Sequence, residues 1–75
     1  MSKTFDEALA DVKPFITHER AAQWAMLDTD HALWVENEIM VPAGINSSVS
    51  TNFGMRLCDS IELVLEALHI ENMGK

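Results

Sequence analysis

The chain has 75 residues, with twelve acidic side chains against five lysines and arginines and a formal net charge of −7. Its length fits one domain, residues 1–75, with a core so small that self-association is a common source of added stability. The negative charge repels phosphate backbones and anionic lipid surfaces, so we expect no direct binding to nucleic acid and none to membranes.

Cysteine usage and the first residues bear on the compartment. Cys58 is the one cysteine in the chain, which excludes an internal disulfide and fits a reducing environment. Residues 1–7 lack the apolar core of a secretory signal, and no run approaches the roughly 18 apolar residues of a membrane span. We therefore expect a cytoplasmic protein in which Cys58 is a buried thiol.

Residues 5–12 are predicted to form a first helix. Thr4 and Glu7 have the spacing of a capping box, in which each side chain accepts a hydrogen bond from the other's backbone amide. Pro14 ends this helix, because the residue before a proline avoids the α-helical region. The apolar residues of the segment recur at helical spacing and form one face: Phe5, Ala8, Leu9 and Val12.

A second helix is predicted to begin after Thr17 and to end near Leu27. Thr17 can act as its N-cap, and Glu19 suits the first turn, where the helix dipole favours an acid. Residues 28–30 are Asp-Thr-Asp, whose short polar side chains bond to their own backbone in turns. We therefore expect the chain to change direction there.

Residues 32–41 are predicted to form a β-hairpin, because β-branched and aromatic residues flank the polar run Glu-Asn-Glu at 36–38. A three-residue loop buries four aliphatic side chains on one face of the hairpin, whereas a two-residue loop mixes the two faces, so we favour the former. Trp34 and Met40 are then cross-strand neighbours on the open face. Both residue types are enriched at interfaces, so this face is expected to bind a partner.

A long amphipathic helix is predicted from about Ser48 to Ile70, with Ser48 or Ser50 as its cap, after a loop at residues 42–47. Residues 72–75 are expected to fray. The predicted core stripe comprises Phe53, Leu57, Ile61, Val64, Leu65 and Leu68. An acidic row on the opposite side comprises Asp59, Glu62 and Glu66. A second apolar strip beside the core stripe comprises Leu63, Ala67 and Ile70.

The predicted fold class is therefore α+β, with two short N-terminal helices, a β-hairpin and a long C-terminal amphipathic helix. Two strands alone make a poor sheet, so the open face of the hairpin needs a cover. The strip Leu63, Ala67 and Ile70 is likewise surplus to the folding of a monomer. Both features lead us to expect a homodimer or a protein partner.

No pattern in the chain predicts a catalytic site, a cofactor site or a metal site strongly enough to indicate an enzyme. Glu66 and His69 have the i, i+3 spacing used in di-iron bundles, and Glu62 lies one turn earlier. Such a site needs the same pair from a second helix. A metal-dependent protein with a site at a dimer interface, including Cys58, is therefore one alternative.

The segment Asp59-Ser60-Ile61-Glu62-Leu63-Val64 resembles the surroundings of the phosphopantetheine serine in acyl carrier proteins, where an Asp-Ser-Leu motif opens a helix. The resemblance covers these six residues only. In that family two further helices follow the serine, whereas Ser60 falls inside the predicted long helix. We therefore interpret Ser60 as a small residue at the edge of the core stripe.

These observations predict a small, acidic, non-enzymatic protein-interaction module without a cofactor. It would bind through Trp34 and Met40 or through Leu63, Ala67 and Ile70. Compact acidic chains of this type occur among phage and mobile-element accessory proteins that inhibit or redirect a host protein. A second alternative is nucleic-acid mimicry, in which Asp59, Glu62 and Glu66 present a carboxylate row to a DNA-binding protein.

Overall fold

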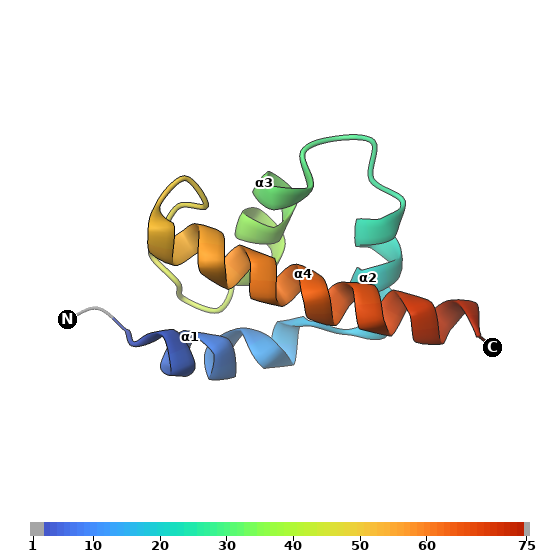
Figure 1. The fold of residues 1–75 in the computed structure, drawn as a ribbon, viewed down its shortest axis with the longest axis horizontal. Helices are drawn as coiled ribbons and strands as arrows, with labels where there is room; N and C mark the ends of the chain where they lie inside the picture. Colours follow the sequence, from blue (N-terminus) through green and yellow to red (C-terminus); the bar gives the residue numbers. More distant parts are fainter. Residues whose placement is uncertain (1–2, 75) are drawn as a thin grey trace.

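The computed structural model describes residues 3–74, and within that part of the chain every regular element is helical (Figure 1). The elements, in chain order, are α1 (Phe5–Val12), a 3₁₀ turn η1 (Lys13–Phe15), α2 (His18–Ala25), α3 (His31–Val35), a π-helical segment η2 (Glu36–Met40) and α4 (Asn52–Met73). The α+β prediction is wrong, because residues 3–74 contain no strand.

The predicted hairpin is instead α3 followed by η2. Asp30, predicted to lie in a turn, caps α3 by accepting a hydrogen bond from the backbone N–H of Leu33 at 3.2 Å. Val35, Ile39 and Met40 are fully buried, and their spacing of four and five residues places them on one side of this helical segment. The Glu-Asn-Glu run at 36–38 is therefore part of a helical segment and not the loop of a hairpin.

The two N-terminal helices begin where their caps predict. Thr4 Oγ1 accepts from the Glu7 N–H at 3.2 Å, and Glu7 Oε1 accepts from the Thr4 N–H at 2.8 Å, so the capping box and the bounds of α1 are confirmed. Thr17 Oγ1 accepts from the Arg20 N–H at 3.1 Å. Helix α2 ends at Ala25, two residues before Leu27, so its predicted end is slightly too late.

The long C-terminal helix is confirmed, with different ends. Thr51 caps it, accepting from the Gly54 N–H at 3.0 Å, while Ser48 and Ser50 belong to the preceding turn. At the other end α4 continues to Met73, beyond the predicted Ile70. Asn72 donates to the His18 carbonyl at 3.0 Å, which ties that end to α2; the last residue of the predicted frayed end lies outside the described residues.

Gly54 lies where α4 crosses the turn at Ser48. A Cβ atom on Gly54 would collide with the Ser48 backbone carbonyl and would come within 3.1 Å of Thr51 Oγ1. Gly54 therefore permits the close approach of this turn to α4. A larger residue would displace the backbone that caps the helix.

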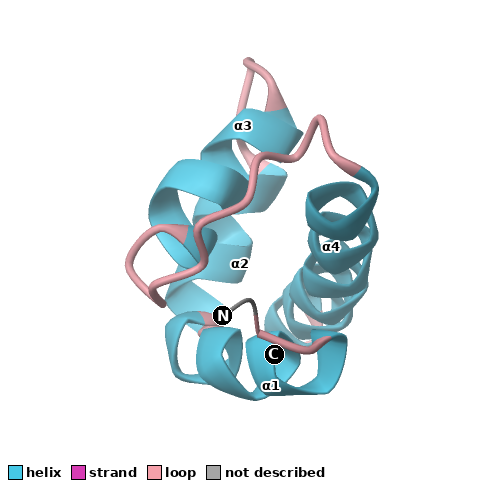
Figure 2. Ribbon diagram, turned by 90° about the vertical axis from the view of Figure 1, so that its left-hand side faces the viewer, coloured by secondary structure: helices cyan, strands magenta, loops and turns pink. Residues whose placement is uncertain are grey.

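The core lies between α4 and the other helices. Viewed along its length in Figure 2, α4 stands on one side, α2 and α3 on the other, and α1 closes the bottom. The buried apolar side chains are Ala8, Val12, Ala21, Val35, Ile39, Met40, Ile45, Leu57, Cys58, Ile61 and Leu65. None of the helices in the described part of the chain is both long enough and apolar enough to cross a bilayer.

Candidate interaction surface

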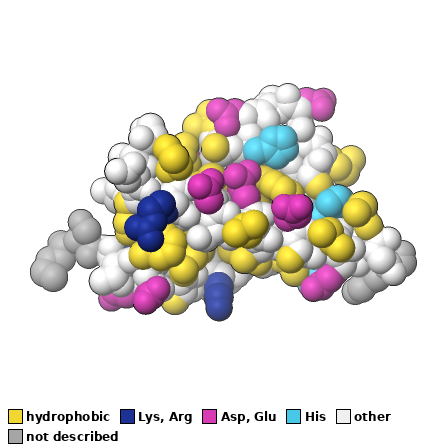
Figure 3. Space-filling model, in the orientation of Figure 1, with side chains coloured by type: hydrophobic (Ala, Val, Ile, Leu, Met, Phe, Trp, Pro, Cys, Tyr) yellow, Lys and Arg dark blue, Asp and Glu magenta, His cyan; other side chains and the backbone are white. Residues whose placement is uncertain are grey.

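The outer side of α4 carries apolar side chains that the rest of the described chain leaves largely exposed. Leu63 is 69 % exposed, Ile70 56 % and Val64 44 %, and Ala67 is also exposed. Figure 3 shows hydrophobic side chains following the line of this helix, with carboxylates beside them. Together with half-buried Ser60, these residues form what we call the α4 face: Ser60, Leu63, Val64, Ala67 and Ile70.

The predicted core stripe wrongly includes Val64, which is 44 % exposed. Leu57, Ile61 and Leu65 are fully buried, and Phe53 and Leu68 pack at the edge of the core. Val64 lies beyond that edge, because α1 ends at Val12 and only η1 and Ile16 follow beneath this part of α4. Val64, which was predicted to lie in the core, is therefore available to a partner.

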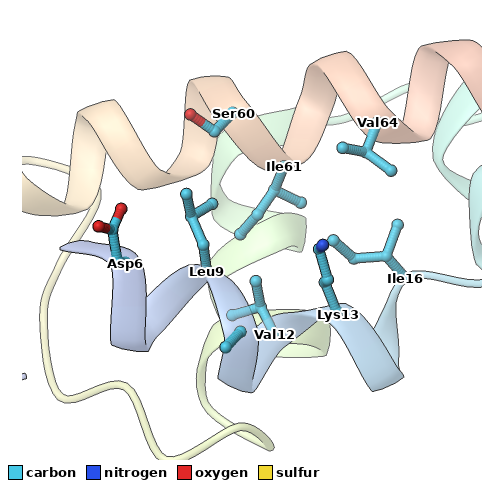
Figure 4. A pocket seen from close by; sticks show the side chains of 9 residues that line it. Asp6, Leu9, Val12, Lys13, Ile16, Ser60, Ile61 and Val64 are labelled. Atoms are coloured by element: carbon cyan, nitrogen blue, oxygen red, sulfur yellow. The ribbon is translucent and has the colours of Figure 1, made fainter. Parts of the chain in front are cut away.

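A groove between α1 and α4 continues the α4 face. It has a volume of about 440 Å³ and is lined by Asp6, Leu9, Ala10, Val12, Lys13, Ile16, Ser60, Ile61 and Val64. In Figure 4, Leu9 rises from α1 toward α4, while Asp6 and Lys13 stand at its margins. The groove shares Ser60 and Val64 with the α4 face, so the two make one continuous surface.

The sequence did not predict this groove. Leu9 and Ile16 form its lower wall. Leu9 belongs to the apolar face predicted for the first helix, whereas Ile16 lies in no predicted element. The signal that could have indicated it is the small residue Ser60 beside Val64 on the edge of α4. A groove forms where a short helix packs beside a small side chain on a longer helix. It therefore depends on which helices pack together, which the local sequence pattern does not show.

Charged groups surround the surface. Arg56 lies one turn before Ser60, and its guanidinium carbon is 4.7 Å from the centre of the Phe5 ring. Glu71 lies at the other end of the α4 face, where its Oε1 is 2.9 Å from His18 Nε2. The α4 face therefore ends in a cation toward the N-terminus of α4 and in a carboxylate toward its C-terminus.

The predicted acidic row is divided in the structure. Asp59 and Glu66 are exposed, but Glu62 is half-buried. Glu62 Oε2 accepts from Trp24 Nε1 at 3.1 Å, and Cys58 Sγ donates to Glu62 Oε1 at 3.8 Å. Glu62 therefore joins α4 to α2, and Asp59 and Glu66 are the two carboxylates of the row that are exposed on the outside of the helix.

The predicted surface of Trp34 and Met40 is not formed. Met40 is fully buried, and Trp34 is half-buried against the core, because residues 31–40 are helical and have no open hairpin face. The proposed partner-binding role of Met40 requires exposure that this side chain does not have. Leu63, Ala67 and Ile70 are exposed as that role requires, and their binding role stays a prediction.

In the part of the chain that the structure describes, the residues weighed as ligands or nucleophiles pair at most two at a time, as Cys58 and Glu62 do. Among residues 3–74, no three His, Cys, Asp or Glu side chains gather as a metal site would need. Burial, followed by the charges of Glu62 and Asp59, raises the pKa of the Cys58 thiol to about 12, so it stays protonated at neutral pH. His69 Nδ1 is buried without a hydrogen-bond partner in the described chain.

Comparison with known proteins adds no relative: no family model, no curated protein and no solved structure matches this chain. The functional argument therefore rests on the surface itself. Its decisive property is the exposure of Leu63 and Ile70, two large aliphatic side chains that the fold leaves in solvent. A surface of this kind can bind a polypeptide.

Proposed function

We propose that this protein is a non-enzymatic interaction module that binds another polypeptide through the α4 face and the adjoining groove. The observation that carries the proposal is the continuous apolar surface from Leu9 and Ile16 across Val64 to Leu63 and Ile70. Exposed apolar patches rimmed by polar groups mark interaction sites on soluble domains.

The energetics support binding through a few side chains. Full burial of a leucine or isoleucine is worth about 1.5–3 kcal/mol, so covering the exposed parts of Leu63 and Ile70 would contribute about 1–2 kcal/mol each. Because both side chains are already uncovered in the monomer, this gain requires no unfolding. Binding and folding can therefore be altered separately.

The wider role follows from the character of the chain. Its small size, net charge of −7 and interaction surface suit an accessory protein that inhibits or redirects a host protein, as some phage and mobile-element products do. The buried single cysteine supports a reducing, cytoplasmic setting. Nucleic-acid mimicry has less support, because Glu62 is bonded to Trp24 and leaves the carboxylate row broken.

A capture experiment with matched variants tests the proposal. The chain, Leu63→Glu and Met26→Glu are immobilised separately and exposed to the same lysate. Met26 is 80 % exposed, follows α2 and lies outside the proposed surface. We expect the same bound protein on the unchanged chain and on Met26→Glu, with at least a tenfold loss on Leu63→Glu. Equal capture by all three would refute the role of the α4 face.

A further inference from the structure

The α4 face has a regular alternation of side-chain size. Ser60, Leu63, Ala67 and Ile70 lie within about 80° of the circumference of α4, at roughly 100° per residue. Along the helix they read small, large, small, large. Leu63 and Ile70 are more than half exposed, while Ser60 and Ala67 are smaller side chains on the same face.

When two copies of this helix face run in opposite directions, the large side chains of one copy lie opposite the small side chains of the other. If a second α4 lies antiparallel, with the two-fold axis outside the α4 face at the level of residue 65 along the helix, position 60 of one copy faces position 70 of the other, and position 63 faces position 67. Each large side chain then enters the space above a small one. From this we infer, on the basis of the proposed interaction surface, that its occupant is a second copy of this chain, packed antiparallel through α4.

The charges at the ends of the face favour the same direction. In the antiparallel arrangement Arg56 of one copy lies beside the C-terminal turn of the other α4. That turn carries the negative end of the helix dipole and the partner's Glu71. A parallel arrangement would instead bring the two Arg56 side chains together and would set large residues against large ones. The antiparallel pair is also isologous, as the contacts of two-fold symmetric homodimers are.

Like charges limit the strength of this dimer. Each chain carries −7, and the two Glu66 carboxylates lie on the same rim, close to the two-fold axis. The contact also uses one helix face, so it belongs among the small interfaces, below about 1,200 Å². We therefore expect a dissociation constant of roughly 10 μM to 1 mM. Added salt should tighten the dimer by screening the repulsion, whereas it would weaken the binding of a basic partner.

Sedimentation equilibrium of the full chain measures this directly. The apparent mass should rise from 8.4 kDa toward twice that value as concentration increases. It should rise further in about 1 M salt than in about 0.1 M salt, since the Debye length falls from about 10 to about 3 Å. Leu63→Glu should remain monomeric, Met26→Glu should dimerise like the unchanged chain, and Glu66→Gln should dimerise more tightly.

Cysteine substitutions test the direction of packing. Under oxidation, a mixture of Leu63→Cys and Ala67→Cys chains should form a mixed disulfide, because these positions face each other. Ser60→Cys alone should not cross-link, since the two Ser60 positions lie about 15 Å apart along the helices. Native Cys58 is buried and does not compete. A Ser60→Cys disulfide, or no excess of mixed over like pairs, would overturn the antiparallel register.

The outcomes separate this inference from the proposed function. A chain that stays monomeric to about 1 mM at both salt concentrations refutes the dimer. If Leu63→Glu also abolishes capture of another protein, the α4 face still binds a polypeptide and only its occupant was assigned wrongly. A dimer that persists in Leu63→Glu refutes the inference, because a different surface would then be responsible.

Discussion

Replacing Gly54 by alanine should destabilise the protein, although the same change inside most helices stabilises them. Helix propensity favours alanine over glycine by about 1 kcal/mol. At Gly54, however, the added Cβ meets the Ser48 carbonyl and crowds Thr51 Oγ1, the atom that caps α4. Overpacking costs about 1–3 kcal/mol and loss of a cap about 0.5–2 kcal/mol. We expect a net loss of about 2 kcal/mol.

Thermal and urea unfolding measure this change. For a domain of this size, about 2 kcal/mol corresponds to a decrease in Tm of roughly 8–16 °C. Gly74→Ala is the matched control, because a Cβ there would lie 3.6 Å from the Glu71 carbonyl oxygen, at ordinary contact distance, and its effect should stay within about 0.5 kcal/mol. If Gly54→Ala is as stable as the unchanged chain, the turn at Ser48 does not pack on α4 as described.

Three further predictions test the core and the contact between α2 and α4. Met40→Ala should cost about 2–5 kcal/mol of unfolding free energy, whereas Leu33→Ala, at a half-exposed position, should cost under about 1 kcal/mol; the reverse order would favour a hairpin. Trp24→Phe and Glu62→Ala each remove one partner of their hydrogen bond and should show a coupling energy of about 1 kcal/mol in a double-mutant cycle, and additive effects would contradict that hydrogen bond. Because the pKa of Cys58 is raised from 9.0 to about 12 in the fold, its contribution to stability is fully present below pH 9 and is lost as the pH rises toward 12. Urea unfolding across that range should show a decrease that Cys58→Ser lacks.

The hairpin prediction failed for a definable reason. Val35 and Ile39 are four residues apart, and this spacing places two side chains on the same side of a strand and also of a helix. The spacing of Val35 and Ile39 therefore does not distinguish a strand from a helix. Met40, five residues after Val35, reaches the same side because residues 36–40 are π-helical, which the spacing does not predict, whereas Asp30 has the position of an N-cap. The cap at Asp30 favours a helix, whereas the aromatic and β-branched residues that follow favour strands.

Local signals predicted the other elements well. The capping box at Thr4 and Glu7 fixed the start of α1, and the fully buried Leu57, Ile61 and Leu65 belong to the predicted stripe of α4. Properties that depend on the meeting of two elements were not predictable in this way. Whether Val64 is covered depends on where α1 ends beneath it, and whether Glu62 is free depends on the Trp24 side chain of another helix.

Core residues and exposed apolar residues lie on different sides of α4, so the interaction hypothesis can be tested without loss of the fold. Leu57 and Ile61 hold the core, so their removal would unfold the chain and reveal nothing about binding. Leu63 and Ile70 are more than half exposed, and a charged residue there should change the stability of the monomer by under about 0.5 kcal/mol. A variant such as Ile70→Glu that keeps its Tm but loses association would therefore assign the loss to the surface itself.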